Sequence, residues 1–101
     1  MEIIRKISEK IDSELEDAQR YIRCAFKVRE EYPQLANTYY MLSLEEMKHV
    51  TMLHEQVAKI IDAYKQDHEV PESMQILYEY LHDRHIKWAA KIKTRQEEYK
   101  A

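Results

Sequence analysis

A glutamate and a histidine lie three residues apart in the segment Glu46-Met47-Lys48-His49, within a run of apolar residues at helical spacing. At about 100° per residue, Glu46 falls almost at the centre of the apolar stripe, and His49 follows on the same face one turn later. An ionised carboxylate in an apolar core is costly unless it is paired or bound to a metal ion. A carboxylate oxygen and an imidazole nitrogen at this spacing can hold one metal ion or bridge two. The segment is therefore a candidate metal site.

A second inward carboxylate lies nearer the N-terminus. Glu14 falls about 60° from the centre of another apolar stripe, in register with Ile11 and Ala18. Glu16 points almost opposite that stripe, so we expect it to be solvated. The chain thus offers one inward Glu from its first segment and one inward Glu-x-x-His pair from its second.

A Glu-x-x-His pair alone is a weak signal, because it arises by chance in charged helices. Glu79 and His82 form another such pair. Both fall off the apolar stripe of their segment, and we expect them to face outward. For Glu46, the alternative to a metal is a basic partner such as Lys48 or Arg20, although both point away from the centres of their stripes.

Long helices must position these residues. The chain has 101 residues, no Gly, two Pro and 35% charged residues, a composition typical of an all-α protein. Proline disfavours helix at the preceding residue, so Pro33 and Pro71 predict helices at about residues 3–31, 34–67 and 72–99. The first two helices must form an antiparallel hairpin, because their connection is very short. We expect one domain spanning residues 1–101.

Composition also argues against several classes of partner. The formal net charge is −3, from 16 basic and 19 acidic residues, so there is no electrostatic footprint for nucleic acid or for a membrane surface. No apolar run is long enough to span a bilayer, and the N-terminus does not read as a secretory signal. Cys24 is the one cysteine and cannot form an intrachain disulfide. We expect a cytoplasmic protein.

Two stretches resemble the ferritin-like di-iron superfamily, and rubrerythrin-type helices most closely. The first runs from Glu14 to Tyr21, and the second runs from Glu30-Glu31-Tyr32-Pro33-Gln34-Leu35-Ala36 into Leu44-Glu45-Glu46-Met47-Lys48-His49. The resemblance covers about residues 8–62. It implies that Glu14 is a terminal ligand, Glu46 a bridging ligand and His49 a nitrogen ligand. It also implies that Tyr21 or Tyr39 hydrogen-bonds a ligand carboxylate.

This chain departs from the family in one respect. Full-length members carry four helices and two sets of Glu plus Glu-x-x-His, whereas this chain has one set. A two-fold dimer would bring together four Glu and two His in a four-helix bundle, as in encapsulated ferritins, although the cargo-loading tail of those proteins is not evident here. We therefore predict a homodimer or a higher even-numbered oligomer. The third helix is expected to pack on the hairpin or to swap across the dimer.

Two functions from different classes follow. The first is a ferroxidase-type di-iron protein that oxidises Fe(II) with O₂ or peroxide, with two iron ions in each dimer site and Glu14, Glu46 and His49 as both metal ligands and catalytic residues. Manganese would suit the same ligands. The alternative is a non-catalytic helical bundle or assembly module with a structural metal or none. Outside this set, we expect His85 to be a hydrogen-bonded core histidine or an accessory ligand, and His54 to lie at an interface edge.

Overall fold

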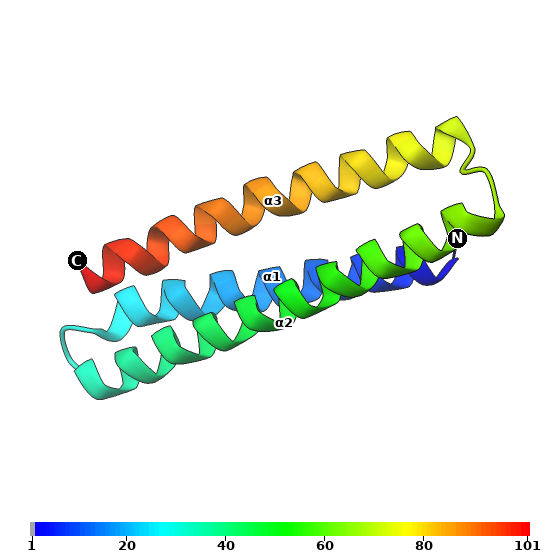
Figure 1. Cartoon of the computed structure of the whole chain (residues 1–101). Coiled ribbons are helices and arrows are strands. Elements are labelled where there is room, and N and C mark those ends of the chain that lie inside the picture. Colours follow the sequence, from blue (N-terminus) through cyan, green and yellow to red (C-terminus); the bar gives the residue numbers. More distant parts are fainter. Residues whose placement is uncertain (1) are drawn as a thin grey trace.

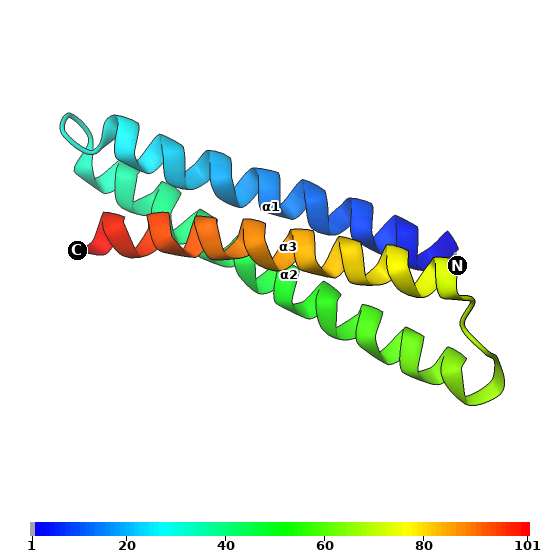
Figure 2. The ribbon, with the colours of Figure 1, turned by 90° about the horizontal axis from the view of Figure 1, so that it is seen from above.

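Three helices account for the fold. The computed structural model describes residues 2–101 and contains, within that range, α1 (Glu2–Val28), α2 (Pro33–Asp67), α3 (Glu72–Lys100) and no strand (Figure 1). The all-α prediction is confirmed. α1 and α2 form an antiparallel hairpin, and α3 lies across one face of it (Figure 2). The molecule is a rod with principal extents of 56 × 19 × 17 Å.

The prolines set the helix boundaries. α2 begins at Pro33, which suits the first turn because a helix leaves that N–H unpaired in any case. Tyr32, the residue before it, is non-helical at φ −132° and ψ 69°. α1 therefore ends at Val28, three residues before the predicted end, and the Tyr32 N–H donates to the Val28 carbonyl at 2.8 Å. α3 begins directly after Pro71.

The core lies where the three helices meet. Buried apolar residues from every helix form one cluster, which consists of Ile11, Leu15, Ala18, Val50 and Ile92. Ile7, Leu53, Val57 and Trp88 are partly buried against it. A continuous apolar core of this kind fixes the azimuth of each helix, and so decides which polar residues face inward.

Buried hydrogen bonds attach α3 to the hairpin. Gln96 Nε2 donates to Ser43 Oγ at 2.9 Å, and Ser43 Oγ donates to the Ala18 carbonyl at 2.7 Å, which links all three helices. Trp88 Nε1 also donates to Gln19 Oε1 at 3.0 Å. Within a single chain, α3 thus packs on the hairpin, which is one of the two expected placements.

Some residues of the predicted apolar stripes are exposed. Leu35 and Leu42 on α2 keep 43% and 38% of their surface in solvent. Leu35 lies in the first turn of α2, and Leu42 lies two turns further along. Leu77 on α3 is 47% exposed, at the end where α3 leans away from the hairpin (Figure 1). The stripes are therefore wider than the surface that one chain buries.

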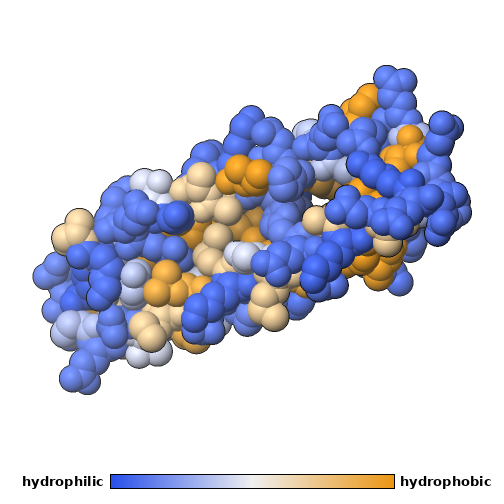
Figure 3. Space-filling model, viewed as in Figure 1, coloured by the Kyte–Doolittle hydropathy of each residue, from blue (hydrophilic) through white to orange (hydrophobic). Residues whose placement is uncertain are grey.

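The outer face of α3 is mainly polar (Figure 3). Apolar residues show mostly along the seam between α3 and the hairpin. Within residues 2–101, no helix combines the length and the apolar character needed to cross a bilayer.

Candidate metal centre

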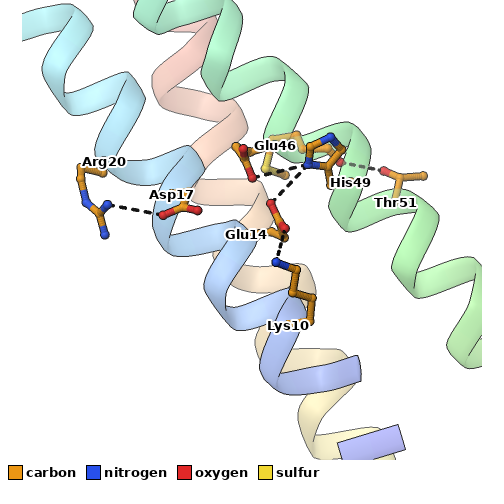
Figure 4. Close-up of polar contacts among 8 residues, drawn as sticks. Lys10, Glu14, Asp17, Arg20, Glu46, His49 and Thr51 are labelled. Atoms are coloured by element: carbon orange, nitrogen blue, oxygen red, sulfur yellow. Dashed lines mark hydrogen bonds and ion pairs between the residues drawn. The ribbon is translucent and has the colours of Figure 1, made fainter. Parts of the chain in front are cut away.

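Glu14, Glu46 and His49 lie together on one side of the hairpin. Glu14 comes from α1, and the other two come from α2 (Figure 4). One ligand atom from each side chain lies within 4.8 Å of the others. His49 Nδ1 is 3.3 Å from Glu14 Oε2 and 3.6 Å from Glu46 Oε2. The structure therefore brings the three predicted ligands into one group.

The hairpin explains why these residues meet. Glu14 lies near the middle of α1, and Glu46 and His49 lie near the middle of α2. In an antiparallel hairpin with a short connection, the midpoints of the two helices lie side by side. Glu46 and His49 are one turn apart on one face, which places both opposite Glu14.

Burial differs across the group. The side chains of Glu14 and Glu46 keep only 10% and 17% of their surface exposed, whereas His49 keeps 49%. Among the described residues, Glu46 Oε2 is the one buried side-chain oxygen or nitrogen with no hydrogen-bond partner. A buried carboxylate oxygen without a partner is costly, so it marks a place where a cation would be stabilising.

The expected basic partners of Glu46 bind other residues. Lys48 Nζ pairs with Glu45 Oε1 at 3.1 Å. Arg20 Nη1 pairs with Asp17 Oδ1 at 3.4 Å. Neither cation reaches Glu46, so the alternative in which one of them neutralises that carboxylate is wrong.

Lys10 is a member of the site that the sequence argument missed. Its ammonium lies 3.1 Å from Glu14 Oε1 (Figure 4). Burial raises the pKa of Glu14, but Lys10 and His49 outweigh burial and hold that pKa below its ordinary value. Glu14 is therefore ionised at neutral pH. The signal that could have found Lys10 is its spacing of four residues from Glu14 on the same helix.

The donor set fits a small divalent ion. Ligand atoms around one ion, with bonds of about 2.0–2.2 Å, stand about 3–4.4 Å apart. The two measured separations from His49 Nδ1, at 3.3 and 3.6 Å, fall in that range. Two carboxylates and one imidazole suit iron and manganese, and they leave coordination positions for further ligands.

Tyr21 and Tyr39 pack together beside the hairpin seam. Their ring centres are 6.2 Å apart in a stacked arrangement. Across residues 2–101, no hydrogen bond joins either hydroxyl to the carboxylate of Glu14 or Glu46. Their role as partners of a ligand carboxylate stays a prediction. Glu16 is exposed, as the helical wheel predicted.

A second polar cluster involves α3. His85 is 1% exposed, and its Nε2 lies 2.7 Å from Asp12 Oδ1 on α1. Arg84 pairs with the same oxygen. His85 is thus a hydrogen-bonded core histidine, as expected. The partner Asp12 was not predicted, because its role depends on where α3 lies against α1.

In comparisons with known proteins, no family model, no curated protein and no solved structure matches this chain. The ferritin-like resemblance therefore stays a prediction from the sequence.

Proposed function

We propose that this chain is half of a di-iron carboxylate protein that oxidises Fe(II) with O₂ or peroxide, at a site shared by two copies. The observation that carries the proposal is the buried Glu46 Oε2, which has no hydrogen-bond partner and lies beside Glu14 and His49. A carboxylate kept in such a position lowers stability, and a bound cation removes that cost.

A second copy of the chain would complete the ligand set. One chain supplies two carboxylates and one imidazole. The ligands lie near the midpoints of α1 and α2, so a two-fold axis beside them would let two hairpins overlap along their whole length. The exposed Leu42 lies one turn before Glu46 on α2, and it and the exposed Leu35 would be covered in such a dimer. The dimer would hold four carboxylates and two imidazoles around two metal ions.

The residues of the site suit this chemistry in different ways. Glu46, at the centre, has two oxygens that can be shared between adjacent ions. Glu14 is already ionised at neutral pH, because Lys10 and His49 lower its pKa. His49 Nδ1 faces both carboxylates, so its lone pair would bind a metal ion held between them. Fe(II) is the substrate: two ions supply the two electrons that, with two protons, reduce O₂ to peroxide or peroxide to two waters.

Lys10 favours a second candidate function. Its ammonium already pairs with Glu14, so one of the two carboxylates has a cationic partner without a metal. Under this alternative the chain is a non-catalytic bundle or assembly module with a structural metal or none. Metal content after purification, and the thermal stability on adding Fe, Mn or Zn, separate the two functions. Absence of metal with unchanged stability favours the module.

The test of the enzymatic proposal uses anaerobically purified protein. Fe(II) is added, and ferric absorbance is followed on exposure to air or on addition of peroxide. Wild type is expected to oxidise Fe(II) faster than the buffer does, and Glu46→Ala is expected to fall to the buffer rate. Glu45→Ala is the matched control, because Glu45 is adjacent to Glu46 in the sequence but is exposed and pairs with Lys48. If Glu46→Ala turns over as fast as wild type, the proposed function is wrong.

A further inference from the structure

Three histidines meet between α2 and α3, away from the candidate di-iron site. His54 on α2 lies between His82 and His85 on α3, with ring centres 5.4 Å apart in each pair. The rings are nearly perpendicular, at 80° and 77°. Two imidazoles bound to one ion, with metal–nitrogen bonds of about 2.0–2.1 Å and a tetrahedral angle, have ring centres roughly 5 Å apart. The observed spacing is close to that value.

Asp12 determines which nitrogen of His85, the most buried of the three histidines, donates a hydrogen bond. An ionised carboxylate only accepts hydrogen bonds, and Asp12 Oδ1 already accepts one from Arg84. The contact of 2.7 Å between His85 Nε2 and Asp12 Oδ1 is therefore donated by the imidazole. A neutral His85 that carries its proton on Nε2 has a lone pair on Nδ1. Carboxylate-oriented imidazoles of this kind are the usual ligands of protein metal sites.

The cluster is open to solvent through a groove. A cavity of about 250 Å³ between α3 and the hairpin is lined by all three histidines. In the space-filling view the seam is hollowed towards the end where α3 begins (Figure 3). Glu79, the partner of His82 in the second Glu-x-x-His pair, lines the same groove. An ion can thus reach the imidazoles without any unfolding of the core.

This position is distinct from the candidate di-iron site. His54 follows Glu46 by eight residues, which places it about 12 Å further along α2 and about 80° around the helix. Glu46 lies beside Glu14 of α1, whereas His54 lies beside the histidine rings of α3. The two groups share no residue.

We propose that His54, His82 and His85 form a second metal site that binds one late transition-metal ion, with Zn²⁺ as the representative ion. Three neutral imidazoles and no carboxylate ligand suit Zn²⁺, Cu²⁺, Ni²⁺ or Co²⁺ better than the carboxylate-rich site does. Among the described residues, only the Glu14 set has all its ligand atoms within 4.8 Å of one another, so metal binding here turns the exposed His82 ring towards the other two. A water molecule would complete a tetrahedral site. The inference does not depend on the proposed di-iron function.

The test measures Zn²⁺ affinity by competition with Co²⁺, whose visible absorption is strong in tetrahedral nitrogen sites. His82→Gln is the main variant, because His82 is exposed and its replacement leaves the core intact. We expect His82→Gln and His54→Gln each to weaken Zn²⁺ binding by at least about tenfold, the scale on which altered metal sites lose affinity. His68→Gln is the matched control, since His68 lies after α2, stacks on Tyr64 and lies outside the cluster.

Each outcome decides the question. Retention of the Co²⁺ spectrum in Glu46→Ala, with its loss in His82→Gln, supports a separate histidine site. Wild-type affinity in His82→Gln overturns the proposal. An equal loss in His68→Gln also overturns it, because the binding would then be scattered over surface imidazoles. If Glu46→Ala loses the Co²⁺ spectrum and His82→Gln keeps it, the ion binds at the carboxylate site. That result overturns the histidine site and leaves the di-iron proposal intact.

Discussion

At the scale of single residues, Glu46 has the one buried side-chain oxygen within residues 2–101 that lacks a hydrogen-bond partner. This atom is Oε2, and Lys48 and Arg20 pair with Glu45 and Asp17 instead. Leaving a buried acceptor unpaired costs about 1–3 kcal/mol, and more for a charged group. A residue that lowers the stability of the metal-free protein in this way is typical of a binding site.

The first prediction concerns that cost. Glu46→Leu keeps a similar volume and removes the unpaired carboxylate, so the metal-free variant should be more stable than wild type by about 1–3 kcal/mol. It should also lose any rise in melting temperature that Mn(II) gives the wild type. Melting curves with chelator and with Mn(II) measure both effects. A metal-free Glu46→Leu that melts below wild type would show that Glu46 contributes to stability without metal.

The inward positions of Glu14, Glu46 and His49 could be predicted from the sequence, because they depend only on helical geometry. The wheel separates the buried Glu14 from the exposed Glu16, and it places His49 one turn after Glu46. The position of Lys10 was harder to predict. A lysine of this length can reach inward or outward, and its spacing from Glu14 shows only that contact is possible.

At the scale of the helices, α3 is attached unevenly. Its C-terminal half is held by Gln96 on Ser43 and by Ile92 in the core. Its first turns lean away from the hairpin beside the histidine groove (Figure 1), where Tyr78 is buried, before Arg84 and His85 contact Asp12. We expect these first turns of α3 to separate from the hairpin before the rest.

The second prediction uses Tyr78 to test the attachment. Burial, and next the neighbouring Tyr64, raise the pKa of Tyr78 above its ordinary value of 10.0. The folded protein therefore keeps the phenol proton when the unfolded chain has lost it, so stability is full below pH 10 and falls as pH rises through the folded pKa. Tyr78→Phe should lose less stability than wild type above pH 10. Denaturant melts across that range measure the difference.

Tyr80→Phe is the control for this prediction, because Tyr80 is 62% exposed on the same helix. It should follow the wild-type curve at every pH. If Tyr78→Phe and wild type lose stability in parallel, burial of the Tyr78 hydroxyl does not govern the alkaline transition.

The hairpin could be predicted at this scale, but the placement of α3 could not. Pro33 and the short connection force α1 and α2 to run antiparallel. The loop around Pro71 leaves the third helix free to take several azimuths, and its apolar stripe is compatible with more than one of them. The contacts of His85 with Asp12, and of His54 with His82, depend on that azimuth. The spacing of residues within one helix does not determine the azimuth at which that helix packs on its neighbours.

At the scale of the whole molecule, the two faces of the hairpin differ. One is covered by α3, through contacts such as those of Ser43 and Gln19. The other is not covered by a helix of the same chain (Figure 2), and on α2 the exposed Leu42 lies one turn before Glu46. A candidate ligand set beside an exposed apolar side chain, near the middle of a rod, is the arrangement expected of an interface between two copies.

The third prediction tests that interface through one side chain. Leu42 lies one turn before Glu46 and is 38% exposed. Leu42→Lys would place a charge at the centre of the proposed dimer, where desolvation costs several kcal/mol. We expect the variant to sediment as a monomer under conditions in which wild type is a dimer, and to bind Mn(II) at least about tenfold more weakly, a factor that corresponds to about 1.4 kcal/mol.

Met41→Lys is the control for this experiment. Met41 is more exposed, at 52%, but is rotated by about 100° around α2 from its neighbour, away from the ligand set. It should leave sedimentation and Mn(II) affinity unchanged. A wild-type monomer that binds two metal ions through Glu14, Glu46 and His49 would contradict the shared site, because within residues 2–101 this group offers only three ligands. If both variants remain dimers, the contact between copies must lie on another face, and the exposed leucines beside Glu46 would need a different partner.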